Sequence, residues 1–330
     1  MPDRMNKPAS PARVTGDKEA QLSNVALLYY GEGMTQGEIA KRMKVSRATI
    51  VNMLRESREL GIVDIRVDGK VLTGSSLARD LREKFGVEDA DVSQASALDE
   101  SAARDESVGQ LARVAAAAIL DVVETGDTIG VAWGETIMAV ANAMPRSPVA
   151  GVEVCQLIGS MISERVPASE NCAIQISGRL EAAACYTLHA PGLISTAALA
   201  ETFRGEATIR AQLRRLQALD LTVSSIGNVA SDTHLAAAGI ATAEELQAAR
   251  AAGAVGIICC RYIAADGQEI AMPPHDRLIA ATLDDLRSAR KRFLAVCGVD
   301  RCDATHAALN AGLVTHLCVD HALARALLDC

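Results

Sequence analysis

The sequence has 330 residues, of which 49% are hydrophobic and 22% charged, a composition typical of a soluble globular protein that can bury a sizeable core. The formal net charge of −8 argues against a protein that coats nucleic acid or an anionic membrane. No stretch approaches the ~20 uninterrupted apolar residues of a membrane-spanning helix, and the first residues, MPDRMNKPASPARVTGD, contain no apolar signal segment. These features predict a cytoplasmic protein with no membrane partner.

Basic residues are concentrated near the N-terminus. Residues 1–70 contain 12 Lys and Arg against 9 Asp and Glu, a net charge of +3, whereas the remainder has a net charge of −11. Such an asymmetry is typical of a small basic domain joined to a larger acidic one, and it indicates an anionic partner for the small domain.

The segment 18–60 predicts three helices, the first over residues 18–31. Thr35 and Glu38 have the T-x-x-E spacing of a capping box at the start of the second helix, and Ser46 is a typical N-cap for the third. A short helix, a tight turn and a longer helix form a helix-turn-helix. The alternation of residue types over 62–67 predicts a strand that would serve as a wing beside it.

The outward side of the third helix is the predicted DNA-contacting surface. Arg47 and Asn52 lie near the start of this helix, where a recognition helix reads bases, and Arg pairs with guanine while Asn pairs with adenine. Neighbouring polar and basic residues are expected to hold the phosphate backbone. The alternative is an ordinary helical bundle with a solvated basic face. The predicted DNA-contacting residues are Thr35, Gln36, Lys44, Ser46, Arg47, Thr49, Asn52 and Arg55.

Beyond about residue 90, Ala-rich helices such as 101–124 and 232–252 alternate with short apolar runs. The runs are DTIGVAWG, VEVCQLIGS, LTVSSIGN, AVGIICCRY, FLAVCG and THLCVD. This alternation predicts an α/β domain with a mainly parallel sheet. The predicted domains are a disordered tail at 1–16, the helix-turn-helix domain at 17–68, a linker with a connecting helix at 69–89 and an effector-binding domain at 90–330.

Cysteine and histidine show no metal-binding spacing. All nine cysteines lie beyond residue 150, none forms a C-x-x-C pair, and the six histidines form no H-E-x-x-H pattern. The cysteines lie mostly in apolar runs, so we expect buried free thiols. Neither a metal site nor a cofactor is predicted.

The segment from Gly126 to Thr136, GDTIGVAWGET, predicts a buried strand, a tight turn and the start of a helix. Free backbone N–H groups at a helix start favour an anion. Gly159, Gly227 and Gly298 also follow apolar runs, and ligands of open α/β sheets bind past the carboxyl ends of the strands. The alternative is a tight turn that binds no ligand.

Several segments together resemble the SorC family of sugar-responsive bacterial transcriptional regulators, and the likeness extends from about residue 20 to the end. The segments are TQGEIAKRMKVSRATIVNMLRESRELGIVDI, GDTIGVAWGETI, APGLIS, GAVGIICCRYIAADGQ and VCGVDRCDATHAALNAGLVTHLCVDHALARALL. The resemblance implies a winged helix-turn-helix followed by a Rossmann-like effector domain similar in fold to sugar-phosphate isomerases and glucosamine-phosphate deaminases. It also implies a phosphorylated sugar as effector and a homodimer or homotetramer that binds operator DNA.

The resemblance also implies a set of effector-binding residues, with three departures from the family pattern. Arg301 replaces a lysine, so it can hold a phosphate but cannot form a Schiff base with an aldehyde. Ala264 replaces an aspartate, which favours a polyol or its phosphate, and Asn52 stands where arginine is frequent. The predicted ligand-binding residues are Gly130, Trp133, Gly134, Glu135, Thr136, Gln156, Gly159, Gln175, Arg261, Asp266 and Arg301.

The rival hypothesis is an enzyme that keeps the isomerase or deaminase activity of its fold relatives. Catalysis of that kind needs a positioned acid and base, and the candidates are Glu135, Asp266, Asp300 and His306. Fold alone cannot decide between the two functions. The helix-turn-helix favours a regulator whose operator binding is controlled by a small carbohydrate, and thereby a carbohydrate catabolic operon.

Overall fold

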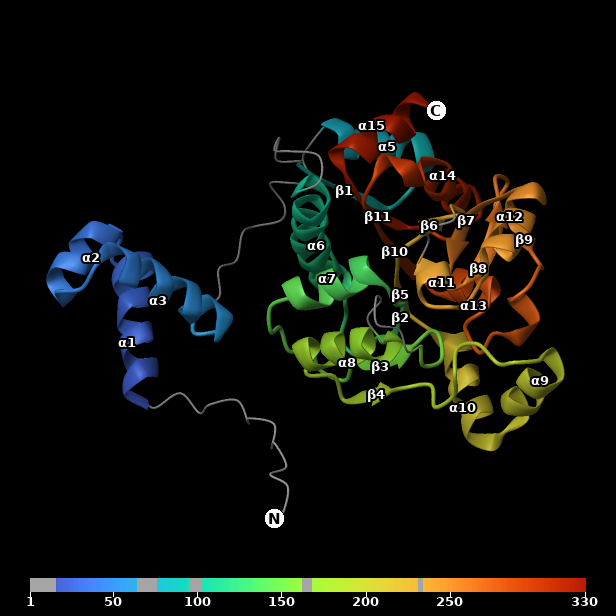
Figure 1. Cartoon of the computed structure of the whole chain (residues 1–330), viewed down its shortest axis with the longest axis horizontal. Coiled ribbons are helices and arrows are strands. Elements are labelled where there is room, and N and C mark those ends of the chain that lie inside the picture. Colours follow the sequence, from blue (N-terminus) through green and yellow to red (C-terminus); the bar gives the residue numbers. More distant parts are fainter. Residues whose placement is uncertain (1–15, 64–75, 95–101, 162–167, 231–233) are drawn as a thin grey trace, which may run out of the picture. The chain divides into compact units, whose positions relative to one another are not determined.

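The computed structural model describes residues 16–63, 76–94, 102–161, 168–230 and 234–330. By its internal contacts the chain divides into two compact units, Met1–Val67 and Asp68–Cys330 (Figure 1).

The first unit is helical. Its elements are α1 (Gly16–Ala26), the π-helical turn η1 (Leu27–Gly31), α2 (Gln36–Met43) and α3 (Arg47–Glu59). The single helix expected over 18–31 is therefore an α-helix that ends in a π turn. A small core between the helices buries Val25, Leu28, Ile39, Ala40, Ile50 and Leu54.

The predicted helix caps are confirmed. The Thr35 hydroxyl accepts a hydrogen bond from the Glu38 N–H at 3.3 Å, and the Glu38 carboxylate accepts one from the Thr35 N–H at 2.8 Å. Ser46 Oγ accepts from the Thr49 N–H at 3.0 Å. These bonds satisfy N–H groups that have no partner within their own helix and so fix where α2 and α3 begin. Of the predicted wing strand, positions 64–67 lie outside the described residues.

The second unit is built on a seven-stranded sheet in which every neighbouring pair is parallel, in the order β1-β11-β10-β5-β2-β3-β4. The predicted mainly parallel α/β fold is confirmed. The strands are β1 (Asp89–Ser93), β2 (Thr128–Val131), β3 (Glu153–Gln156), β4 (Ala184–Tyr186), β5 (Leu221–Ser224), β10 (Lys291–Val296) and β11 (His316–Asp320). The sequence analysis did not identify β1 and β4, the two edge strands. The segment of β1 has no continuous apolar run, and the run that contains β4, AAACY, is rich in alanine, which favours helices.

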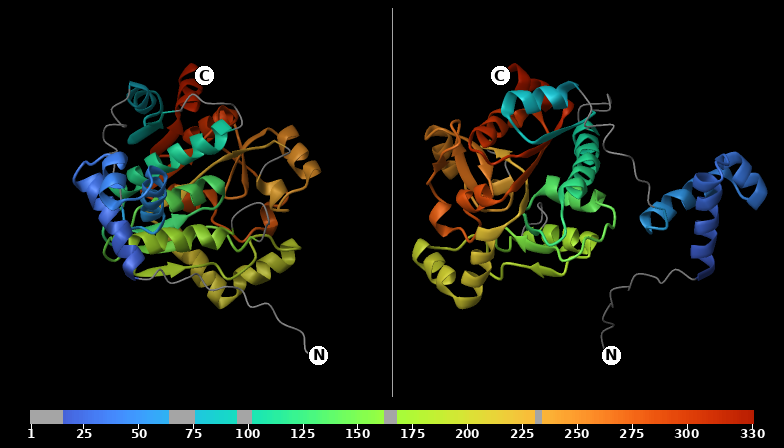
Figure 2. Two further views of the ribbon diagram at one scale, coloured as in Figure 1. Left: turned by 60° about the vertical axis from the view of Figure 1, so that its left-hand side comes forward. Right: turned by 180° about the vertical axis from the view of Figure 1, so that it is seen from behind.

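Helices cover both faces of this sheet (Figure 2). One layer contains α6, α7 and α8, and the other contains α5, α14 and α15, each with its own apolar core. The helices of this unit are α5 (Ser76–Phe85), α6 (Ala102–Val122), α7 (Glu135–Ala143), α8 (Ser169–Leu180), α9 (Ala197–Gly205), α10 (Ala207–Arg215), α11 (His234–Ala237), α12 (Ala243–Ala251), α13 (Leu283–Ser288), α14 (Cys302–Asn310) and α15 (His321–Asp329). The short 3-10 turns are η2 (Leu216–Ala218), η3 (His275–Arg277) and η4 (Val299–Arg301).

A second, antiparallel sheet has the order β6-β7-β8-β9. The run AVGIICCRY, expected in the parallel sheet, instead forms a hairpin. Cys259 and Cys260 connect its two strands with φ of 46° and 63°, as a type I′ turn requires. Its strands are β6 (Gly227–Asn228), β7 (Ala254–Ile258), β8 (Arg261–Ala264) and β9 (Glu269–Ile270).

Two expected helices differ from the sequence interpretation. The helix expected over 232–252 is two helices, α11 and α12, because a turn at Gly239 (φ 69°) and a capping box at Thr242 separate them. The connecting helix α5 is present and belongs to the second unit, since Ala78 and Leu81 are fully buried in its core. Figure 2 shows α5 and α15 side by side.

Candidate functional site

In the first unit, α3 has a buried side and an exposed side. Ile50, Leu54 and Ser57 face inward, and the Ser57 hydroxyl donates to the Leu22 carbonyl at 3.2 Å or to the Met53 carbonyl at 2.8 Å. The predicted DNA-contacting residues of this helix are all exposed; they are Arg47, Thr49, Asn52 and Arg55. Residues on one face of a helix are three or four positions apart. Packing of the buried residues against the core therefore turns the predicted DNA-contacting residues toward solvent.

The start of α2 lies next to the start of α3. The Arg47 Nε donates to the Gln36 Oε1 at 3.3 Å, so these two predicted contact residues meet. The hydroxyls of Thr35 and Ser46 are engaged as helix caps, and Lys44 is exposed in a left-handed conformation at the end of α2 (φ 56°). An open hollow of about 730 Å³ borders this junction, and its lining includes Tyr29, Tyr30, Thr35, Gln36 and Arg47.

In the second unit, the loops after the parallel strands meet at the carboxyl edge of the sheet. After β2, Gly134 caps α7 with φ 119°, a value that favours glycine. The helix hydrogen bonds begin where the Met138 N–H donates to the Gly134 carbonyl at 2.9 Å. The N–H groups of Glu135, Thr136 and Ile137 precede that bond and have no acceptor within the helix. This turn therefore has the donors that an anion requires.

Two residues of this turn contact buried thiols. The Gly134 N–H donates to the Cys172 thiol, and the Trp133 side chain hydrogen-bonds with the Cys260 thiol. Burial raises the pKa of Cys172 to about 11, which keeps that thiol neutral at physiological pH. Trp133 is 5% exposed and joins the β2 turn to the β7–β8 turn. Its position is that of a packing residue that supports the edge.

Two of the predicted glycines are enclosed by protein. A Cβ atom on Gly130 would lie 2.7 Å from both Leu157 Cδ2 and Leu219 Cδ1, and one on Gly159 would lie 2.4 Å from the Ala190 carbonyl oxygen. The space beside these two predicted ligand-binding glycines is therefore filled by neighbouring side chains and backbone.

Gln156 ends β3 and organises the neighbouring loops. It is 2% exposed; its amide nitrogen donates to Ser169 Oγ at 2.8 Å and its amide oxygen accepts from the Leu188 N–H at 2.9 Å. Sequence reasoning missed Ser169, the first residue of α8, whose only local signal was its position at a helix start. Gln175, in contrast, bonds to Asn142 at 2.8 Å. It lies about 9 Å along α8 from Ser169, away from the edge.

Arg261 and Asp266 lie at opposite ends of β8. Arg261 is 7% exposed, and it donates to the Ala281 carbonyl at 2.7 Å and to Glu269 Oε1 at 2.8 Å. Glu269 also lies 2.8 Å from His275 Nδ1, so this carboxylate joins both side chains. Neither Glu269 nor His275 was identified from the sequence, because their pairing depends on the hairpin and on the turn η3.

Asp266 is exposed and accepts from the Gln268 N–H at 3.0 Å in the β8–β9 turn. The next residue, Gly267, approaches Ala311, beyond the last turn of α14. Because α14 begins at the carboxyl edge and is nine residues long, Asp266 lies about 13 Å further along, away from the predicted site. Asp266 therefore lies apart from the other predicted effector-binding residues of the carboxyl edge.

Arg301 follows β10 in the turn η4. Its guanidinium donates to the Cys297 carbonyl and lies 3.6 Å from the Asp300 carboxylate. Asn228, another residue that sequence reasoning missed, donates to Asp300 at 2.8 Å. Since β5 separates β10 from β2, the Arg301 turn and the Gly134 turn are about 10 Å apart along the sheet edge. Both turns therefore belong to one edge, with the β5 loop between them.

The structure does not bring the four candidate catalytic groups together. Glu135 is exposed at the start of α7, Asp300 bonds to Asn228, and Asp266 lies at the far end of β8. The His306 ring packs edge-on against Phe85 of α5, with 5.6 Å between ring centroids. Among the described residues, no group of three or more His, Cys, Asp or Glu side chains is arranged to hold a metal ion.

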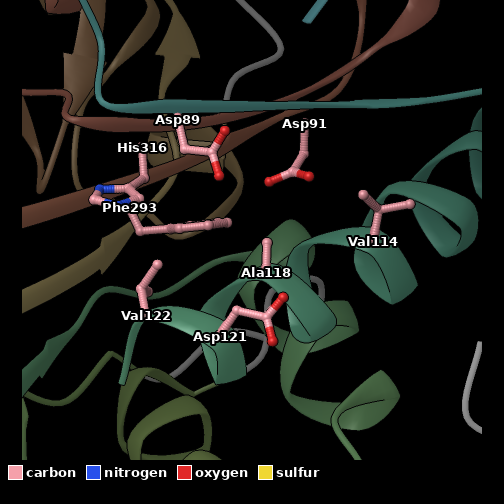
Figure 3. Close-up of a pocket in the computed structure, with 8 residues that line it drawn as sticks. All are labelled: Asp89, Asp91, Val114, Ala118, Asp121, Val122, Phe293 and His316. Carbon is pink, nitrogen blue, oxygen red and sulfur yellow. The ribbon is translucent and has the colours of Figure 1, made fainter. Parts of the chain in front are cut away.

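A separate small cavity lies between α6 and the amino ends of β1, β10 and β11 (Figure 3). Its volume is about 30 Å³, and the carboxyl groups of Asp89, Asp91 and Asp121 line it together with His316. Such a space holds roughly one water molecule. It lies at the opposite end of the strands from the predicted effector site.

In the part of the chain that the structure describes, no helix is long and apolar enough to span a membrane.

Comparison with known proteins places this geometry in a family. Residues 70–329 match the family model described as "Putative sugar-binding domain". The chain is 32% identical over 310 residues to the transcriptional regulator YjhU of Escherichia coli K12, covering 92% of each chain. It is 29% identical over 315 residues to the deoxyribonucleoside regulator of Bacillus subtilis, covering 95% of this chain and 99% of that one.

The fold is that of a solved regulator. The full-length sorbitol operon regulator SorC from Klebsiella pneumoniae superposes with a TM-score of 0.71 at 23% identity, covering 95% of this chain and all of that chain. The relatives are transcriptional regulators rather than enzymes. The chain therefore belongs to the SorC family of transcriptional regulators, with the family's sugar-binding domain as its larger part.

Proposed function

We propose that this transcriptional regulator binds operator DNA through α3, and that a phosphorylated sugar or polyol at the carboxyl edge of the large sheet changes its affinity for DNA. Such control requires only that the effector bind the DNA-competent and DNA-incompetent states with different affinities. The controlled genes would form a carbohydrate catabolic operon. Because operator DNA is cytoplasmic, the protein would act in the cytoplasm.

The observation that carries the effector proposal is the turn before α7. It offers N–H groups of Glu135, Thr136 and Ile137 that the helix does not use, and a helix start attracts an anionic group. Arg301, in the turn that follows β10, the second strand from β2 along the same edge, would supply a cation. A bound phosphate would draw its guanidinium from the Cys297 carbonyl, because a charged acceptor forms the stronger hydrogen bond.

The names of two relatives agree with this chemistry. One relative is named a deoxyribonucleoside regulator, and another is named a sorbitol operon regulator. Both names refer to compounds that contain a sugar or a polyol. The departure at Ala264, where the family pattern has an aspartate, would shape the part of the site that receives the carbohydrate.

The DNA-binding proposal rests on the capped, exposed start of α3. A single helix-turn-helix makes few contacts, so tight operator binding is expected from a homodimer or homotetramer that places two copies on two half-sites. Sedimentation at micromolar concentration tests this. A monomer that still binds operator tightly would contradict it.

One experiment tests the regulator and its effector together. Thermal-shift screening would compare pentoses, hexoses and hexitols, each with and without a terminal phosphate, because a ligand of the native state raises Tm. Each hit would then be added to the protein bound to fluorescent DNA from the promoter of its own operon. We expect a phosphorylated hit to change DNA affinity and to be recovered unchanged. Consumption of the hit with no change in DNA affinity would instead support an enzyme.

A further inference from the structure

Two cysteines from distant parts of the chain meet beside α15. Cys302 is the first residue of α14, and Cys330 follows the last residue of α15. Their Sγ atoms are 3.5 Å apart. Cys302 is 9% exposed, whereas Cys330 is exposed to solvent. One thiol of the pair is therefore open to a dissolved reagent, and the other lies against it in the protein.

Lysine 84 of α5 holds this arrangement in place. Its ammonium group donates to the carbonyl oxygens of Leu327, Leu328 and Cys330 at 3.1, 2.9 and 3.0 Å. The three bonds bind the end of α15, and with it the Cys330 backbone, to a helix that packs on the same layer. The contact between the two thiols is thus supported on the Cys330 side by a backbone that Lys84 holds in place.

We propose that Cys302 and Cys330 are a redox-sensitive pair that hydrogen peroxide converts to a reversible intramolecular disulfide. The Cys330 thiolate attacks one peroxide oxygen, the O–O bond breaks, and the departing hydroxide takes up the thiol proton as water, leaving a sulfenic acid. The Cys302 sulfur then attacks the Cys330 sulfur, the S–O bond breaks, and a second water leaves. The two thiols lose two electrons and two protons, and the peroxide is reduced to two waters.

The surroundings of each thiol assign the order of these steps. The pKa of Cys302 is raised to about 12, chiefly by burial and also by the neighbouring Cys330 thiol and Asp303, while Lys84 opposes the shift. Cys302 is therefore a poor first nucleophile. Oxidation of Cys330 removes the contribution of that thiol, while the Lys84 charge remains to favour the Cys302 thiolate. The exposed cysteine reacts first and the buried one resolves it.

The disulfide would tie the start of α14 to the end of α15. Bond formation requires the two sulfur atoms to approach from 3.5 Å to about 2 Å, a movement that Cys330, just beyond the last turn of α15, can supply. The closed loop runs from Cys302 to Cys330, and a cross-link of that kind stabilises the folded state chiefly by restricting the unfolded chain. Because Cys302 directly follows Arg301, the link would also restrain the turn η4.

The test uses the reduced full-length protein treated with an equimolar amount of hydrogen peroxide. We expect free thiols to fall from nine to seven, the intact mass to drop by two hydrogen atoms, and tandem mass spectrometry to find Cys302 joined to Cys330. Dithiothreitol should restore all thiols. The oxidised protein should also show a higher Tm than the reduced one.

Three variants make the assignment specific. Cys330→Ser, at an exposed position, should abolish the mass change without altering the circular dichroism spectrum, and Cys302→Ala should leave Cys330 as a sulfenic acid. Cys185→Ser removes the other exposed cysteine and should oxidise as the wild type does. A disulfide-linked dimer, a sulfinic acid at Cys330 as the sole product, or nine unreacted thiols in the folded wild type would each overturn the proposal.

Discussion

At the scale of single residues, Asp91 is a buried carboxyl group whose ionised form is destabilised by its surroundings. This side chain is 5% exposed on β1 and points into the small cavity of Figure 3. The pKa of Asp91 is raised to about 7, chiefly by burial and also by the nearby carboxylates Asp89 and Asp121, while Arg82 opposes the shift. His316, which faces the same cavity, has its pKa lowered by burial. Both groups are therefore held toward their neutral forms.

The sign of the pH effect follows from these shifts. Below its ordinary pKa, Asp91 is protonated in both folded and unfolded chains. Between that value and about 7 only the folded chain keeps the proton, so stability falls as pH rises through this window and then stays constant. The lowered pKa of His316 acts oppositely, since stability is lost as pH falls below the ordinary histidine value.

We predict that Asp91→Asn raises the free energy of unfolding at about pH 8 and has little effect at about pH 4, because the amide stays neutral throughout. Urea denaturation across this range measures the difference between variant and wild type, which cancels the contribution of His316. Asp121→Asn changes an exposed carboxylate at the same cavity and should alter the pH dependence much less. Parallel curves for Asp91→Asn and wild type would show that Asp91 is ionised in both states.

Gly130 shows why the surroundings of a single residue are hard to predict from the sequence. Gly130 was expected to admit a ligand, yet Leu157 and Leu219 occupy the space beside it. The local pattern marks a position where a side chain does not fit. It does not say what fills the space, because Leu157 and Leu219 arrive from other strands and loops.

Gly130→Ala should therefore lower the free energy of unfolding by about 1–3 kcal/mol through overpacking. The matched control is Gly178→Ala on α8, where an added Cβ meets nothing within 4 Å. That change should stabilise the protein by roughly 0.5–1 kcal/mol, because alanine is the better helix former. Denaturant unfolding of both variants measures the contrast. Equal effects of the two changes would mean that β2 moves to accept the methyl group.

At the scale of elements, features fixed by neighbouring residues can be predicted from the sequence, whereas features that depend on distant residues cannot. The caps at Thr35 and Ser46 could be predicted because the residues that bond are three positions apart. The β7–β8 hairpin could not, since Cys259 and Cys260 adopt left-handed backbone angles that favour glycine or asparagine. Tertiary packing, including the Trp133 contact with Cys260, supports a turn that the local sequence does not favour.

The proposed DNA-reading role of α3 leads to a prediction about base specificity. If Arg47 and Asn52 read bases, alanine at either position should cost ~1–3 kcal/mol on operator and relax the preference at one base pair. Lys44→Ala should weaken operator and random DNA alike and reduce the salt dependence. Fluorescence anisotropy at several salt concentrations separates the two behaviours. Arg250→Ala, on the exposed side of α12, serves as the charge-matched control.

If alanine at Arg47, Asn52 and Lys44 reduced the affinity for operator and for random DNA equally in all three variants, the assignment of base readers would be contradicted. The side chain of Arg47 also bonds to Gln36, so its folded state must be compared by circular dichroism. A Gln36→Ala variant that keeps full specificity would show that Arg47 reads its base without this partner.

At the scale of the whole molecule, the order of motifs predicted the family and fold, whereas the site was predicted only in part. Gln156 ends a parallel strand, and Gly134 and Arg301 lie in the turns that follow two others, so parallel topology alone brings all three to one edge. To place Gln175 and Asp266 correctly, one would need the orientation of α8 and of the β8–β9 hairpin. The structure places both residues away from the edge. The residues at the carboxyl ends of parallel strands can thus be predicted from the sequence pattern, while the direction of side chains beyond them requires the packed structure.

The proposed effector site at the carboxyl edge of the large sheet leads to a prediction about ligand charge. A phosphorylated sugar or polyol should bind more tightly than its unphosphorylated parent, because the α7 start and Arg301 both favour an anion. Arg301→Ala should remove most of that difference, a loss of about 10- to 100-fold in affinity for the phosphate. DNA binding without effector should remain unchanged, since α3 belongs to the other unit. Isothermal titration calorimetry with matched pairs of ligands measures the difference.

Two variants separate the phosphate from other causes. Asp266→Asn, at the far end of β8, should leave both affinities unchanged, which controls for a general effect of altered charge. Glu135→Gln removes an exposed negative charge beside the free N–H groups and should strengthen phosphate binding. If the neutral polyol binds as well as its phosphate to the wild type, the α7 turn is a packing feature alone. The effector would then be a free polyol held by other groups along the edge.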